Sequence, residues 1–259
     1  MSKVFQRVTG VAFLVLLSAL PALADDASLK ERVERRLAGS KLLSEGDIQV
    51  STSGEAVVLD GAVVTVAARN QAERAARKEA RVVENRVRIV PPERTDEDVA
   101  KDVRSAILRT PFYGVFDSVE MGIDHGVVTL AGSVYRENRK DDIDAAVARV
   151  PGVREIESRI AVQSVSFFDD RLRRETYNRI YGNPTFVQYS SWANPPIRIV
   201  VDRGRITLSG WVQSNVDRAM VENVARGTLA FDVVNHLHVD GEKPEDQKPT
   251  AAEGPAIEI

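Results

Sequence analysis

The chain has 259 residues, a small excess of acidic over basic side chains, and no cysteine. Its 35 Lys and Arg face 38 Asp and Glu, so it lacks the basic surface on which nucleic-acid binding depends, and no nucleic acid is expected as a partner. The absence of cysteine excludes a disulfide framework, thiolate catalysis and cysteine-ligated zinc.

The N-terminal segment has the three parts of a secretory signal peptide. Lys3 and Arg7 precede an apolar run over residues 11–20, and Ala22 and Ala24 are the small residues that signal peptidase requires. The run is short for a membrane span and an acidic pair follows it, so we expect cleavage after Ala24. An uncleaved anchor is the alternative. The mature chain is then expected in the periplasm, with no transmembrane span.

One unit of sequence recurs three times along the chain. A first marker, an apolar stretch that contains a glycine and ends in valine, occupies residues 57–63, 128–134 and 206–212. A second marker follows at nearly constant spacing, over residues 83–89, 156–162 and 233–239. Two markers that stay in step across three copies predict three equivalent modules.

Each copy has the pattern helix, strand, strand, helix, strand. In the second copy Val99, Val103 and Ile107 have helical spacing, and Asp96 or Asp98 is expected to cap that helix. Turn or bulge roles are expected for five glycines of the hairpins, Gly61, Gly126, Gly132, Gly204 and Gly210. The predicted fold class is α+β, with three tandem αββαβ modules, each consisting of two helices packed on a three-stranded mixed sheet.

Composition sets the expected boundaries. Pro91 and Pro92 form a stiff boundary after the first module, whereas the very short linker after the second should join it to the third as a rigid pair. The C-terminal tail is rich in Glu, Lys, Pro and Ala and is expected to lack fixed structure. The expected segments are a signal peptide over 1–24, a divergent first module over 25–92, a second over 95–163, a third over 166–240 and the tail over 241–259.

The second helix of the first module carries smaller residues than its counterparts. Ala72 and Ala76 stand where the second module has Ile143 and Val147. Smaller side chains bury less apolar area, so we expect the first module to have the thinnest core and to open first.

The repeat resembles the BON domain of bacterial envelope proteins, of the type found in an osmotically induced periplasmic protein. Residues 126–134 match its Gly-x-Val-Thr-Leu-x-Gly-x-Val hairpin throughout, residues 204–212 have isoleucine for valine, and residues 55–61 depart further. The resemblance covers residues from about 27 to 240. It implies periplasmic residence, no catalysis, no cofactor, and association with phospholipid or with envelope proteins. It also places lipid contact on the first helix and the adjoining loop of a module, here residues 107–116.

That stretch has an unusual aromatic loop. Phe112, Tyr113 and Phe116 follow the predicted helix, with Arg104 and Arg109 beside them. Exposed, these rings would form an apolar wedge with a basic rim, suited to an anionic lipid surface. Buried, they would close the end of the core or the seam with the third module. The sequence leaves both interpretations open.

The third copy has an insertion rich in aromatic residues. Trp192 lies in it, and Trp211 follows the glycine of the returning strand. Both side chains suit a membrane interface as well as a seam between domains. His236 and His238 could begin a metal site, but no third ligand is suggested nearby, so no metal is expected. Motifs for nucleophilic, phosphate or dinucleotide chemistry are missing from the sequence, so no catalytic residue is assigned.

Two functions follow from these patterns. The first is a non-enzymatic periplasmic protein that contacts phospholipid membrane surfaces in envelope maintenance or osmotic stress protection. The second is an envelope scaffold that binds other proteins through exposed sheet edges and aromatic loops. Exposure of the loop at 112–116 would favour lipid, and its burial would favour the scaffold.

Overall fold

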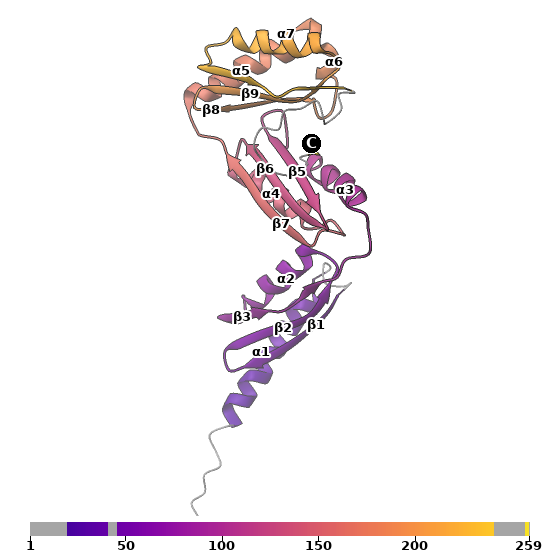
Figure 1. Cartoon of the computed structure of the whole chain (residues 1–259). Helices are drawn as coiled ribbons and strands as arrows, with labels where there is room; N and C mark the ends of the chain where they lie inside the picture. The colour runs from indigo at the N-terminus through magenta and orange to yellow at the C-terminus, as the bar shows by residue number, and fades with distance from the viewer. Residues whose placement is uncertain (1–19, 41–45, 241–256, 259) are drawn as a thin grey trace, which may run out of the picture. The chain divides into compact units, whose positions relative to one another are not determined.

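A computed structural model of the chain describes residues 20–40, 46–240 and 257–258 (Figure 1). It shows the αββαβ order three times in succession and confirms the predicted fold class. The first module consists of α1 (Leu20–Ala38), β1 (Asp47–Ser53), β2 (Ala56–Val63), α2 (Val66–Ala76), β3 (Val82–Asn85) and β4 (Arg88–Ile89). The second consists of α3 (Asp96–Leu108), β5 (Ser118–Asp124), β6 (Val127–Val134), α4 (Glu137–Val147) and β7 (Glu155–Val162). The third consists of α5 (Phe167–Tyr181), η2 (Pro184–Phe186), α6 (Val187–Ser190), β8 (Ile197–Asp202), β9 (Arg205–Val212), α7 (Asn215–Arg226), β10 (Asp232–Asn235) and β11 (His238–Val239).

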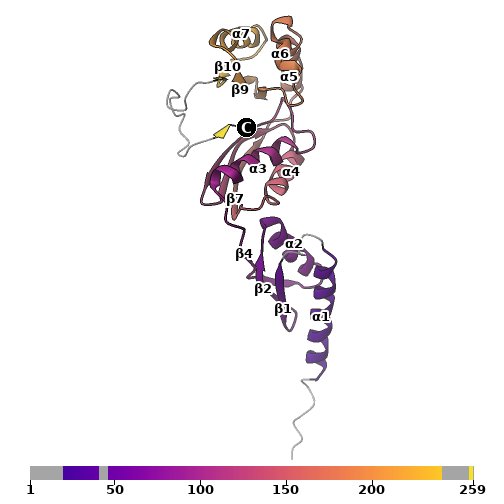
Figure 2. The ribbon, with the colours of Figure 1, turned by 90° about the vertical axis from the view of Figure 1, so that its right-hand side faces the viewer.

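Each sheet is mixed, with the returning strand of the hairpin at its centre. In the second module β5 and β6 are antiparallel, with Met121 opposite Leu130, while β6 and β7 are parallel, with Leu130 opposite Ser158. The same pattern relates β1, β2 and β3, and also β8, β9 and β10. Helices α3 and α4 pack side by side over the sheet of their module (Figure 2). The parallel pairing follows because a helix crosses over between the second and third strands.

The last strand is interrupted in the first and third modules but continuous in the second. At the break, the side-chain carbonyl of Asn85 accepts the Val87 N–H (3.2 Å), and that of Asn235 accepts the Leu237 N–H (3.0 Å). The second module has Ser158 at this position, within an unbroken β7. An asparagine that bonds its own backbone two residues ahead therefore accounts for each break.

An aspartate from the first helix holds the hairpin turn in two modules. The Asp96 carboxylate accepts the backbone N–H groups of His125 (2.8 Å) and Gly126 (3.0 Å). Asp169 likewise accepts those of Arg203 and Gly204, at 3.1 and 2.7 Å. The expectation that Asp96 or Asp98 caps α3 was wrong, since Thr95 is the N-cap and accepts the Asp98 N–H. The hairpin turn, with positive φ at both central residues, provides two N–H groups that a nearby carboxylate satisfies.

Glycines in the returning strands allow a close approach of the partner strand. Gly61, Gly132 and Gly210 have φ of 125°, 110° and 95°. A Cβ at these positions would lie 2.0, 2.3 and 1.9 Å from the carbonyl oxygens of Asp47, Ser118 and Pro196, which are at or next to the start of the neighbouring strand. Any side chain would therefore force the two strands apart.

The chain forms two compact units. Residues 1–62 and 70–88 belong to one, and residues 63–69 and 89–259 to the other, which thus holds the second and third modules together. Each of these two modules has its own apolar core. The side chains of Val99, Val103 and Ile107 are buried in the first of these cores, as their spacing predicts.

Both ends of the chain lie largely outside the described residues. The apolar run of the predicted signal peptide, residues 11–20, lies outside the described residues except for Leu20, and cleavage after Ala24 stays a prediction. Most of the expected tail is also undescribed, but Ile257–Glu258 form a short strand, β12, that pairs antiparallel with the outer edge of β5. Among described helices, none is long and apolar enough to cross a membrane.

Candidate functional site

The aromatic loop after α3 is divided between the interior and solvent. Tyr113 is buried, and Phe116 is half-buried against the core of the third module. The Phe116 ring lies 6.0 Å from the rings of Tyr135 and Tyr177, edge to face with both. Phe112, in contrast, is 82 % exposed. Tyr113 therefore packs in the core of the second module and Phe116 against that of the third, and of the three rings only that of Phe112 faces solvent.

Phe112 has a backbone conformation that aromatic residues rarely adopt. Its φ is +65°, in the left-handed region. The guanidinium carbon of Arg139 lies 5.4 Å from its ring centroid, within the range of a cation–π interaction. Asp117 fixes the rest of the loop, because its carboxylate accepts the N–H groups of Gly114 (3.0 Å) and Tyr135 (2.8 Å). Hydrogen bonds thus hold the loop directly after a ring that faces solvent.

The two arginines expected at the rim have different surroundings. Arg109 is exposed and is the C-cap residue of α3, three residues before Phe112. Arg104 is also exposed but lines a pocket of about 510 Å³, together with Leu108, Trp192 and Trp211. The structure therefore places Arg104 with the two tryptophans, and Arg109 at the end of α3 that leads into the aromatic loop.

Both tryptophans meet at this pocket in the seam of the second and third modules. The Trp192 and Trp211 rings are 5.3 Å apart at an interplanar angle of 80°. Trp192 is half exposed, and Trp211 is half-buried. Burial next to this region raises the pKa of Tyr181, whose hydroxyl donates to the Ile197 carbonyl at 2.6 Å. The aromatic insertion thus contributes mainly to the core and the seam.

A buried polar network joins the second and third modules. Arg173 is 2 % exposed and donates from Nε to the Gln163 side-chain carbonyl (3.1 Å) and from Nη1 to Asp170 (2.7 Å). Its Nη2 donates to the carbonyl of Val201. The Gln163 amide in turn donates to the Phe116 carbonyl at 2.7 Å. The network holds the aromatic loop of one module to a helix and a strand of the next.

The sequence did not point to three further aromatic residues at the surface. Phe168 and Phe231 stack with ring centroids 5.4 Å apart, and the adjacent Phe167 is almost fully exposed. Ser166 is the N-cap of α5 and accepts the Asp169 N–H. A signal was available for Phe167, because it directly follows a capping serine and lies outside the stripe that Leu172, Thr176 and Ile180 form.

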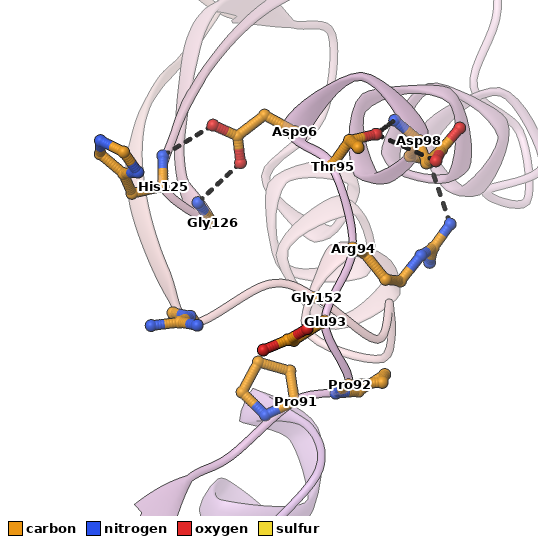
Figure 3. A pocket seen from close by; sticks show the side chains of 11 residues that line it. Pro91, Pro92, Glu93, Arg94, Thr95, Asp96, Asp98, His125, Gly126 and Gly152 are labelled. Carbon is orange, nitrogen blue, oxygen red and sulfur yellow. Dashed lines mark hydrogen bonds between the residues drawn. The ribbon is translucent and has the colours of Figure 1, made fainter.

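Another pocket, of about 660 Å³, lies beside the hairpin turn of the second module (Figure 3). Asp96, Asp124 and His125 come close enough there to suggest a metal site. Both Asp96 oxygens, however, already accept backbone N–H groups of the turn. Arg94 donates to the carbonyl groups of Pro151 and Asp98. The polar groups of this pocket hold the linker and the turn in place, so we assign it no chemistry.

Comparisons with known proteins agree with the repeat. The model of the BON domain matches residues 25–91, 95–164 and 185–241. A comparison with curated proteins gave no match. Among solved structures, CdsD, a structural protein of the type III secretion system of Chlamydia trachomatis, is similar with 14 % identity over 81 % of this chain and 91 % of that chain, at a TM-score of 0.24. Its C-terminal domain is similar with 13 % identity over 82 % and 96 %, also at 0.24. A TM-score this low supports no structural conclusion.

The family match covers most of the chain, in three parts that fall one in each module, and the third part begins after α5. BON-domain proteins are typically periplasmic and generally non-catalytic, and their domains are reported to bind membranes. The chain belongs to the BON domain family, with three tandem copies of the domain.

Proposed function

We propose that this protein is a non-enzymatic periplasmic binding protein that contacts anionic phospholipid bilayers, in envelope maintenance or osmotic stress protection. The observation that carries the proposal is Phe112, a large apolar side chain held in solvent by a strained and firmly bonded loop. A left-handed backbone at a non-glycine residue costs on the order of 1–3 kcal/mol. Strained backbone of this kind is typical of functional sites, and here it holds an apolar ring in solvent.

The energies fit a weak, reversible membrane contact. Full burial of a phenylalanine side chain contributes about 1.5–3 kcal/mol, and most of that is available to Phe112. Arg109 adds roughly 1 kcal/mol near an anionic surface. The sum corresponds to a dissociation constant in about the millimolar range, so one loop alone would bind only transiently. The exposed Phe167 and the Phe168–Phe231 pair offer a second contact on the same compact unit, and linked contacts bind more tightly than either alone.

Co-sedimentation with vesicles tests the proposal. The full chain should bind vesicles rich in phosphatidylglycerol more strongly than phosphatidylcholine vesicles, and high salt should weaken the binding. Phe112→Ala should lower the partition coefficient roughly 10- to 30-fold, which corresponds to about 1.5–2 kcal/mol. Val216→Ala is the matched control, since Val216 is an exposed apolar residue on α7. Failure of the wild-type chain to bind, or equal binding by both variants, would refute the proposal.

A specific observation favours the scaffold as a second candidate. The outer edge of β5 accepts an extended segment, β12, with Ile257 opposite Met121 and Glu258 opposite Glu120. An edge that pairs with two residues of its own chain has N–H and C=O groups free for a partner strand beyond them. A photo-crosslinker at Asp124, on the part of β5 that β12 does not cover, should then capture one protein in stoichiometric amount in living cells. Capture of many proteins, each in traces, would contradict this candidate.

A further inference from the structure

The third module buries two arginines in different ways. Arg173 and Arg198 are 2 % and 3 % exposed. Arg173 has an acceptor for each of its three nitrogens, as described above. For Arg198, neither Nε nor Nη1 has a hydrogen-bond partner. The second position of β8 therefore holds a cation with two nitrogens that lack acceptors.

Such an arrangement is costly without a counter-charge. A guanidinium stays protonated in proteins, and taking it out of water costs several kcal/mol unless acceptors replace the water. The ring of Tyr113, with its centroid 4.9 Å from the Arg198 guanidinium carbon, provides a cation–π contact but no acceptor for these two N–H groups. Arg173 shows that the same module supplies acceptors to a buried arginine where the arginine has a structural role.

Arg198 lines the pocket in which the two tryptophans meet. The lining has no aspartate or glutamate, and Arg104 adds a second guanidinium. Leu108, Trp192 and Trp211 supply apolar walls. A volume of about 510 Å³ lies within the range of small-molecule sites, which are mostly apolar with a few placed polar groups. One part of the pocket lining is thus basic, and another part is apolar.

We propose that this pocket binds a small anionic amphiphile, whose phosphate or carboxylate group pairs with Arg198 and whose apolar body lies against Trp192 and Trp211. Guanidinium groups bind both kinds of head group through two parallel hydrogen bonds. The site is distinct from the bilayer contact through Phe112, because Phe112 does not line the pocket. It adds the capture of single amphiphile molecules to the proposed function and does not depend on it.

The chain itself provides the probe. Its sequence contains 2 tryptophans, and both line this pocket, so intrinsic tryptophan fluorescence of the full chain reports on it. We would titrate with octyl phosphate below its critical micelle concentration, with octyl glucoside as an uncharged amphiphile, and with inorganic phosphate as an anion without an apolar body. Octyl phosphate should shift the emission saturably and bind at least 10-fold more tightly than either of the other two compounds.

Substitutions test whether the Arg198 guanidinium binds octyl phosphate. Arg198→Met keeps the apolar volume and removes the charge, and it should weaken octyl phosphate binding roughly 10- to 100-fold. Arg205→Met is the matched control, because Arg205 is an exposed arginine on the neighbouring strand β9. Circular dichroism confirms that each variant is folded. If Arg198→Met does not fold, the comparison of the three compounds on the wild-type chain still tests whether the pocket binds an anionic amphiphile.

Several outcomes would overturn the proposal. Equal affinity for octyl glucoside would show that no anion site exists. Equal affinity for inorganic phosphate would show that the apolar walls contribute nothing, and unchanged affinity in Arg198→Met would remove Arg198 from the site. Phe112→Ala should leave octyl phosphate binding unchanged while vesicle binding falls, so that failure of the pocket and failure of the membrane contact are told apart.

Discussion

Replacement of Arg173 by methionine should uncouple the second and third modules. The change removes three hydrogen bonds from a charged donor and leaves the Val201 carbonyl without its partner. Bonds to charged groups contribute about 1.5–3 kcal/mol each, but they are not additive, and Asp170 is partly exposed and regains water. Removal of one partner from a buried ionic network typically costs about 3–5 kcal/mol, and we expect a loss in that range.

Calorimetry and hydrogen exchange of the full chain test this expectation. For a folding unit of this size, 1 kcal/mol lowers Tm by about 2–4 °C, so the transition of the second and third modules should fall by roughly 10 °C. Amides in the seam, such as the Ile199 N–H that bonds the Val115 carbonyl at 2.7 Å, should lose protection first. Arg173→Lys should retain little of the lost thermal stability, since one ammonium group cannot satisfy three separated acceptors.

The matched control is Arg171→Met, an exposed arginine on the same helix, which should change Tm by less than about 2 °C. An Arg173→Met variant with the thermal stability and seam protection of the control would refute the reasoning. It would mean that the rings of Phe116 and its neighbours hold the seam without the polar network.

Three further predictions concern the strands, the linker and the first module. Gly132→Ala should destabilise the chain by more than about 3 kcal/mol in urea unfolding, since it adds backbone strain and a contact of 2.3 Å, whereas Gly114→Ala, with its nearest contact at 3.7 Å, should be nearly neutral. Hydrogen bonding to Ser164, whose N–H donates to Asp202 at 2.9 Å, lowers the pKa of Asp202. This stabilisation is complete above the ordinary aspartate pKa of about 3.9 and is lost as the pH falls through the lower folded-state value, and in Asp202→Asn the acid-induced loss of stability should be smaller. Hydrogen exchange should be fastest in the first module, whose buried Ala72 fills less space than Ile143 does in the second; slower exchange there than in the second module would show the argument from side-chain size to be wrong.

The module architecture could be predicted because the signals for it are local and repeated. Helical and strand periodicity, turn glycines and a constant spacing between two markers determine the order of elements and their pairing. The interruption of the last strand could not be read from periodicity, although Asn85 and Asn235 occupy equivalent places. Its cause is a side-chain bond to the backbone two residues ahead, which competes with the regular ladder.

The candidate sites were less predictable because they depend on contacts across a seam. The sequence placed Arg104, Trp192 and Trp211 in separate segments, and only the packing of two modules brings them to one pocket. It also grouped Phe112 with Tyr113, although one is exposed and the other buried. Arg198 carried a signal, since it is a charged residue in the otherwise apolar stretch Ile197–Val201.

Differences between equivalent positions, rather than the shared pattern, locate the special features of this chain. Asp96 and Asp169 have the same role at the hairpin turn, so α3 and α5 can be aligned on them. Arg173 then stands where the second module has Ala100, and both are buried. Ala100 packs into the core of the second module, whereas the arginine at the equivalent place lies against the Tyr135 ring of the neighbouring module. The repeat therefore supplies a stable scaffold, and residues that depart from it build the seam and the pocket within it.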